Sequence, residues 1–90
     1  MRKIHIPGDK FSTEEELHEF VQEQFNFPNY YGKNLDALYD ALSELTEKTQ
    51  VIISSSIADE ENLGEYGENF LTVLEEAAQD NGDLKIKIIE

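Results

Sequence analysis

Three carboxylates spaced four residues apart are the side chains best suited to chemistry in this sequence: Asp36, Asp40 and Glu44. On a helix that begins at Asn34 they share one side, and Asp36 and Asp40 could act together as an acid and a base. Such enzymes need a deep cleft that holds the substrate and sets the two pKa values apart. A chain of 90 residues leaves little room for that cleft, so a dicarboxylate enzyme is the weaker hypothesis.

Other kinds of catalytic or metal-binding site find little support. His5 falls in an apparent strand, and His18, on a helix beside carboxylates, is typical of a surface residue rather than of a zinc ligand. Ser54, Ser55 and Ser56 have no histidine in register and read as a polar loop. The sequence has no cysteine, no glycine-rich phosphate loop, no GxSxG and no HExxH. We therefore expect no catalytic residue, no metal and no cofactor.

Asp36, Asp40 and Glu44, here called the acidic stripe, are better explained by binding. Like charges at this spacing destabilise an isolated helix by roughly 0.2–0.5 kcal/mol per pair, so helix stability gives no reason for them. Tyr39 shares their exposed side, and Tyr30 and Tyr31 precede the helix. Gly32 follows and can take backbone angles that a larger residue resists. Exposed tyrosines around carboxylates are typical of a protein interface.

The overall charge points to the same class of partner. Twenty acidic residues and seven basic ones give a formal net charge of −13. Nucleic acid and anionic membranes would be repelled, whereas a basic protein would be attracted. Residues 1–7 lack the apolar stretch of a signal peptide, and no segment has the roughly 20 apolar residues needed to span a bilayer. We expect a cytoplasmic protein that binds a basic protein, and neither nucleic acid nor membrane.

The elements that position these residues follow from hydrophobic periodicity. Alternating apolar residues predict a first strand around residues 4–6. Two overlapping capping boxes in residues 12–16 predict the start of a helix that runs to about Asn26. A second helix should begin at Asn34, because leucines at three- and four-residue steps mark its buried side. These leucines are Leu35, Leu38, Leu42 and Leu45.

The middle of the chain predicts a strand and a short helix. Residues 50–57 contain Val51-Ile52-Ile53, an unbroken β-branched run that is typical of a strand covered on both faces. Residues 58–63 should form the short helix, and Gly64 should close it.

The last third predicts one more helix and one more strand. Apolar residues recur at helical spacing from Phe70 to Ala78, residues 81–82 form a cap, and residues 84–88 alternate. The order is therefore strand, two helices, strand, two helices, strand. Because strands joined by helical crossovers pair in parallel, we expect an α/β fold with a three-stranded parallel sheet packed with about four helices. Residues 1–90 should form a single domain.

The segment Tyr30-Tyr31-Gly32-Lys33-Asn34-Leu35-Asp36-Ala37-Leu38-Tyr39-Asp40 resembles the signature of the barstar family of ribonuclease inhibitors. The resemblance extends over essentially the whole chain and includes Leu17-His18 and the ending from Val73 to Ile88. It implies a parallel three-stranded sheet packed with helices. It also implies an intracellular inhibitor that blocks a small, basic, secreted microbial ribonuclease of the barnase type. We expect the protein to be monomeric when free and to bind one molecule of its partner.

The resemblance also implies roles for individual residues. Asp40 resembles the carboxylate that enters the phosphate-binding site of the ribonuclease, Asp36 resembles a second acid beside it, and Glu44 falls toward the rim. Further contacts are implied at Tyr30, Asn34, Leu35 and Tyr39, and on the later helix at Val73 and Glu76. An immunity-type or regulatory binding module on the same fold, with a different basic partner, stays open because a fold does not fix function.

Overall fold

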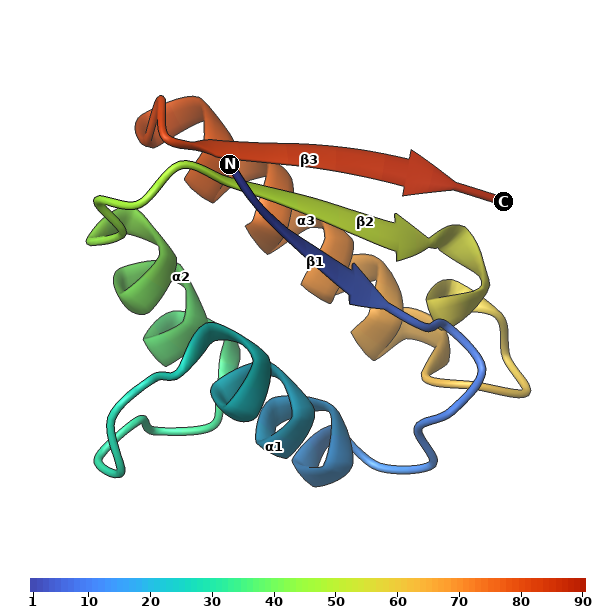
Figure 1. Cartoon of the computed structure of the whole chain (residues 1–90). Helices are drawn as coiled ribbons and strands as arrows, with labels where there is room; N and C mark the ends of the chain where they lie inside the picture. Colours follow the sequence, from blue (N-terminus) through green and yellow to red (C-terminus); the bar gives the residue numbers. More distant parts are fainter.

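The computed structural model describes residues 1–90 and shows a parallel sheet with its helices on one side (Figure 1). In chain order the elements are β1 (Arg2–Ile6), α1 (Glu14–Phe25), α2 (Leu35–Ser43), β2 (Thr49–Ser54), the 3-10 helix η1 (Ser55–Ala58), α3 (Gly64–Asp80) and β3 (Leu84–Ile89). The three strands are parallel and lie in the order β1-β2-β3. The predicted α/β class and the parallel three-stranded sheet are confirmed.

The sheet is covered by helices on one face only. Ile4 pairs with Val51, and His5 pairs with Ile52, which pairs in turn with Lys87. Ile4 and Val51 are buried against the helices, whereas His5 and Lys87 are exposed on the other side. The prediction that the middle strand is covered on both faces is wrong, because sequential strand order with right-handed crossovers puts every connecting helix on the same side. We call the uncovered side the open face; its side chains include Lys3, His5, Ile52, Lys85 and Lys87.

Helix α1 begins and ends close to the predicted positions. The backbone N–H of Glu16 donates to Thr13 Oγ1 (3.1 Å), and the backbone N–H of Thr13 donates to Glu16 Oε1 (3.2 Å), so one of the two predicted capping boxes forms. Asn26 ends the helix in the left-handed conformation, with φ 60°. The turn that leads from α1 into residues 27–33 is therefore fixed by local backbone chemistry.

The segment after β2 differs from the prediction. The short helix is η1, one 3-10 turn that begins at Ser55, rather than an α-helix over residues 58–63. Gly64 does not close it; with φ 53°, Gly64 is the first residue of α3. Ser54 caps η1, because its Oγ accepts from the backbone N–H of Ser56 (3.2 Å), so the serines belong to β2 and η1 rather than to a loop. The molecule thus has three α-helices and one 3-10 turn in place of about four helices.

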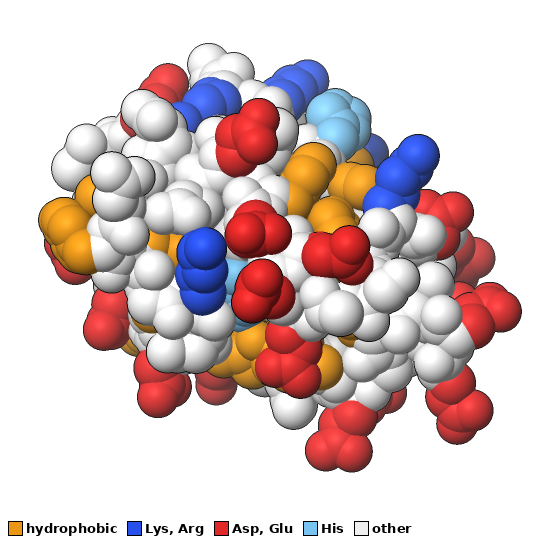
Figure 2. Space-filling view, turned by 90° about the horizontal axis from the view of Figure 1, so that it is seen from below, with side chains coloured by type: hydrophobic (Ala, Val, Ile, Leu, Met, Phe, Trp, Pro, Cys, Tyr) orange, Lys and Arg blue, Asp and Glu red, His pale blue; other side chains and the backbone are white.

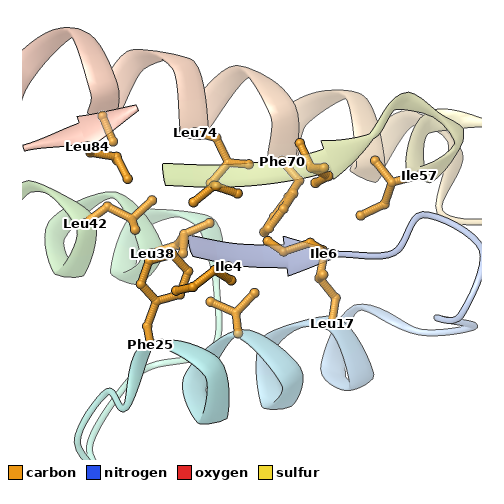
Figure 3. Packing of buried hydrophobic residues seen from close by; sticks show 14 of the residues in the cluster. Ile4, Ile6, Leu17, Phe25, Leu38, Leu42, Ile57, Phe70, Leu74 and Leu84 are labelled. Carbon is orange, nitrogen blue, oxygen red and sulfur yellow. The ribbon is translucent and has the colours of Figure 1, made fainter. Parts of the chain in front are cut away.

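The hydrophobic core lies between the sheet and the helices. Figure 3 shows buried side chains from all three strands and from α1, α2, α3 and η1 meeting in one cluster. Leu38 and Leu42 of α2 have no exposed surface in this cluster. Because these leucines fix one side of α2 against the core, the opposite side of the helix faces solvent. None of the helices is long and apolar enough to cross a membrane.

Candidate partner-binding site

Helix α2 presents the acidic stripe on its solvent side. Asn34 caps the helix, because its Oδ1 accepts from the backbone N–H of Ala37 at 2.7 Å. Asp36, Asp40 and Glu44 are all exposed, as predicted. None of them forms an ion pair within the chain, since the two ion pairs of the molecule join Arg2 to Glu47 and Lys33 to Glu19. The stripe is therefore an uncompensated negative surface.

The loop of residues 27–33, here called the binding loop, presents Tyr30. The backbone N–H of Phe27 donates to Gln22 O (2.9 Å), and the side-chain amide of Gln22 donates to Pro28 O (2.9 Å). The backbone N–H of Tyr31 also donates to Pro28 O (3.0 Å). With the loop tied to α1 in this way, the Tyr30 side chain remains 88% exposed. Its exposure agrees with the prediction that it is available to a partner.

Tyr31 corrects the prediction of two exposed tyrosines, because it is only 7% exposed. Its hydroxyl lies 2.7 Å from Nδ1 of His18, and the hydroxyl of Tyr66 lies 2.6 Å from Nε2 of the same ring. His18 is fully buried, so the prediction of a surface histidine is also wrong. A polar ring can lie in the core when both of its nitrogens have hydrogen-bond partners. These three residues, the Tyr31–His18–Tyr66 chain, join the binding loop to α1 and α3.

Burial shifts the pKa values of the three residues in the Tyr31–His18–Tyr66 chain. It lowers the pKa of His18, because the imidazolium loses water that the protein does not replace with charge. It raises the pKa of Tyr31 and the pKa of Tyr66 in the same way, since the phenolate is the charged form. At neutral pH the uncharged imidazole of His18 is therefore hydrogen-bonded to two uncharged phenols. One ring nitrogen donates a hydrogen bond and the other accepts one.

Gly32 does not have the backbone role that was expected from sequence. The left-handed residue is Lys33, with φ 53°, and not Gly32. Gly32 lies at a close approach instead, because a Cβ at this position would lie 3.1 Å from Ala37 Cβ, closer than in most such contacts. The absence of a Cβ at Gly32 thus lets the binding loop pack closely on the first turn of α2.

Tyr39 lies at the junction of α2 and α3 and gathers carboxylates from both helices. It is half-buried, and its hydroxyl donates to Asp80 Oδ2 on α3. The hydrogen bond to Asp80 raises the pKa of Tyr39 most, and the negative charges of Asp80, Glu76 and Asp40 raise it further. Asp40 of α2 and Glu76 of α3, predicted to serve one interface, are thus brought around one side chain. Tyr39 is therefore less exposed than predicted.

The remaining predicted contacts surround this junction or support it. Leu35 and Val73 are half-buried against the core, and Asn34 is exposed at the start of α2. Asp80 is one of the carboxylates around Tyr39, but it was not among the predicted site residues. Its position four residues after Glu76, on the same side of α3, is the sequence signal that could have identified it.

A pocket of about 380 Å³ opens between the binding loop and α2. One wall is aromatic and includes Phe27, Tyr30 and Tyr31, while α2 contributes Asp40 and Glu44. Sequence reasoning missed this pocket, because it depends on how the loop folds back on the helix. Glu44, expected toward the rim, lies in the same wall as Asp40, whereas Asp36 is outside the pocket.

The surface around the site is strongly acidic. Figure 2, which views the molecule from the α1 side, shows carboxylates scattered across this face and fewer Lys and Arg side chains, mainly toward its upper edge. No group of three or more His, Asp or Glu side chains is arranged to hold a metal ion. The arrangement is suited to contact with a positively charged surface.

Two comparisons with known proteins agree with each other. The model of the family described as "Barstar (barnase inhibitor)" matches residues 1–89. A protein of Bacillus subtilis (strain 168) named "Putative ribonuclease inhibitor YrdF" is 37% identical over 90 residues, which cover 99% of this chain and 98% of that protein.

Proposed function

The chain belongs to the barstar family, and from that premise we propose that it inhibits a small, basic microbial ribonuclease of the barnase type by occupying its active site. The observation that carries the proposal is the position of Asp40. This carboxylate is exposed on α2, has no cationic partner in the chain, and lines the same pocket as the exposed Tyr30. An unpaired carboxylate held by a rigid helix is ready to pair with cations of another protein.

The chemistry of the partner explains the choice of a carboxylate. A ribonuclease stabilises the charge of a phosphate with cationic and hydrogen-bonding groups, and a carboxylate can occupy the same positive site without being cleaved. We assign Asp40 to the centre of the interface and Asp36 to a neighbouring cation. Tyr30 supplies a flat aromatic surface, and Tyr39 with Glu76 forms the α3 side.

Further contacts complete the proposed interface. Asn34, Leu35 and Val73 lie at its edges, and Leu35 and Val73 also support it from the core. We propose that residues 1–90 act as one domain, monomeric when free and cytoplasmic, that binds one molecule of a secreted enzyme. No residue of the chain is assigned a catalytic role.

Titration tests the proposal directly. Isothermal calorimetry with a panel of barnase-type ribonucleases should give a one-to-one complex with at least one enzyme, and RNA cleavage should stop at equivalence. Asp40→Asn keeps the shape of the side chain and removes its charge, so it should bind much more weakly. Unaltered RNA cleavage across the panel at micromolar inhibitor would exclude a barnase-type target. A complex that forms without loss of cleavage would favour the regulatory module with a different basic partner.

A further inference from the structure

Asn81, which lies between α3 and β3, ties the end of one helix to the end of another. Helix α3 ends at Asp80, and Asn81 follows it with extended backbone, φ −132° and ψ 106°. The side-chain nitrogen of Asn81 donates to the carbonyl oxygens of Leu42 (2.9 Å) and Leu45 (3.0 Å) at the end of α2. Its side-chain oxygen accepts from the backbone N–H of Asp83 at 2.9 Å. These three hydrogen bonds are here called the Asn81 bracket.

The bracket depends on the amide group of the side chain. The last carbonyl groups of a helix have no partner within the helix, and Asn81 supplies donors to the end of α2 from 39 and 36 positions away in sequence. An amide has two N–H donors and a carbonyl acceptor, so one side chain makes all three bonds. A carboxylate accepts only, and it would face two carbonyl oxygens without a donor.

The residue after Asn81 is glycine, and this pair is chemically reactive. The backbone nitrogen of Gly82 can attack Cγ of Asn81. The new N–Cγ bond closes a succinimide ring, while the bond from Cγ to the side-chain nitrogen breaks and ammonia leaves with the backbone proton. Water then opens the ring at either carbonyl carbon, which leaves aspartate or isoaspartate and needs no oxidant or reductant. A side chain on the attacking residue hinders the first step, whereas glycine has no Cβ.

Sequence and structure both distinguish Asn81 from the other asparagines. The other five precede Phe, Tyr or Leu; they are Asn26, Asn29, Asn34, Asn62 and Asn69. Gly82 is exposed, and nothing lies within 4 Å of the position that a Cβ would take. Packing around Gly82 therefore does not shield this peptide bond from water.

We propose that Asn81 is a site of spontaneous deamidation, that the Asn81 bracket delays the reaction in the folded chain, and that the product releases the end of α2. Ring closure removes the side-chain nitrogen, so its bonds to Leu42 and Leu45 must open first. After the reaction a carboxylate replaces the donor, at the end of α2 where the helix dipole is already negative. The bracket cannot form again, so the change is permanent. The inference does not rest on the proposed function, because it concerns bonds within the chain.

Incubation of the full chain in mildly alkaline buffer tests the site and the delay. Peptide mapping by mass spectrometry, with aspartate and isoaspartate separated, should show Asn81 converted before the other asparagines. Conversion should be at least about tenfold slower in the folded chain than in urea, as expected if two hydrogen bonds must break first. Gly82→Ala keeps the bracket and should slow the reaction strongly in both states.

Several results of this incubation would overturn the inference. They are equal rates in the folded and the unfolded chain, faster conversion of another asparagine, no conversion of Asn81 in the folded chain within weeks, and a Gly82→Ala chain that reacts as fast as the wild type.

The structural consequence is tested with Asn81→Asp, which supplies the reaction product directly. It should lower the folding equilibrium constant by about tenfold or more, because two carbonyl groups lose their donor. Hydrogen exchange should become faster at the end of α2, in residues 42–45. Asn69→Asp, at an exposed position of α3, adds the same charge and should change the constant by less than about threefold. If Asn81→Asp does not fold, Asn81→Ala removes the donors without adding charge. Wild-type stability and exchange in the Asn81 variant would refute the release of α2.

Discussion

Asp36, Asp40 and Glu44 are chemically similar, but each has different neighbours. Asp40 faces the pocket and also contributes to the negative charge around Tyr39. Glu44 lines the pocket but is not one of the charges around Tyr39. Asp36 lies in the first turn of α2, outside the pocket. If only net charge mattered, the three residues would contribute equally to binding. Their different positions predict unequal contributions.

Asp40→Ala should therefore weaken the complex most, by about 3 kcal/mol, because it leaves cations of the partner buried and unpaired. Asp36→Ala and Glu44→Ala should each cost less, and the loss for Asp40 should come mainly from faster dissociation. The free protein should not lose stability, since Asp40 has no partner in the chain and its removal relieves like-charge repulsion. Dissociation rates and thermal melts of the three variants decide this. Equal losses, or a clearly lower melting temperature for Asp40→Ala, would contradict it.

His18 should make folding stability depend on pH. Burial lowers its pKa below the ordinary value of 6.5, so the unfolded chain takes up a proton first as pH falls. The contribution of neutral His18 is complete above about pH 6.5 and is lost as the pH falls toward the folded-state pKa. Because the acidic residues titrate as well, the comparison is between the wild type and His18→Gln. The stability advantage of the wild type should shrink from about pH 8 to about pH 5 in urea unfolding; a constant difference would show no such linkage.

At the scale of elements, the binding loop contains one residue in a strained conformation. Lys33 has φ 53°, a region that costs a side chain with a Cβ about 1 kcal/mol and glycine almost nothing. Lys33→Gly should therefore be about 1 kcal/mol more stable than Lys33→Ala. Both variants lose the ion pair with Glu19, so their difference isolates the backbone. Chemical denaturation measures it, and equal stabilities would mean that the loop relaxes to another conformation.

The contact between α3 and η1 depends on a glycine. A Cβ at Gly67 would lie 2.0 Å from the carbonyl oxygen of Ile57, a distance that forces the two elements apart. Although alanine favours a helix by about 1 kcal/mol, Gly67→Ala should destabilise the protein by about 2 kcal/mol, because overpacking of backbone outweighs propensity. Gly82→Ala is the control, since nothing lies within 4 Å of its Cβ, and it should change stability by less than about 0.5 kcal/mol. A stabilised Gly67→Ala would refute the close packing.

The contact between α3 and η1 is an example of a feature that could not be predicted from the sequence. Periodicity and capping located β1, α1, α2 and β3, because those signals are local to each segment. The start of α3 was missed because Gly64 and Gly67 are set by a turn and by packing on η1, which leave no local pattern.

In the candidate site too, features with a local sequence signal were predicted and features set by tertiary contacts were not. The exposure of Asp40 followed from helical spacing, and that of Tyr30 from its expected place in an interface loop before the helix. The burial of His18 and Tyr31 did not, since each satisfies its polar atoms only through residues distant in sequence. The pocket needed the tertiary fold as well.

At the scale of the whole molecule, charge is unevenly distributed. No residue of the three strands is acidic, although the chain has 20 acidic residues and a net charge of −13. Lysines and a histidine occupy the open face, while the carboxylates lie on the helices, the loops and the chain end.

Salt should accordingly slow association with a basic ribonuclease far more than it speeds dissociation. The long-range attraction is screened over a Debye length of about 10 Å at 0.1 M, whereas pairs already formed in the interface are screened less. Stopped-flow mixing at several salt concentrations measures both rates. A dissociation rate that rises more steeply than the association rate falls would contradict this role of the acidic surface.

The open face of the sheet has one more consequence. A molecule with extents of 34 × 28 × 18 Å that is positive on its bare sheet and negative on its helices has an electric dipole as well as a net charge. The field of a basic partner therefore exerts a torque on it, in addition to a pull. With a basic ribonuclease as partner, the torque would turn the helical side, which includes Asp40 of α2, toward it before the surfaces touch. The lysines of the open face, which lie away from the proposed interface, would thereby shorten the rotational search for the partner.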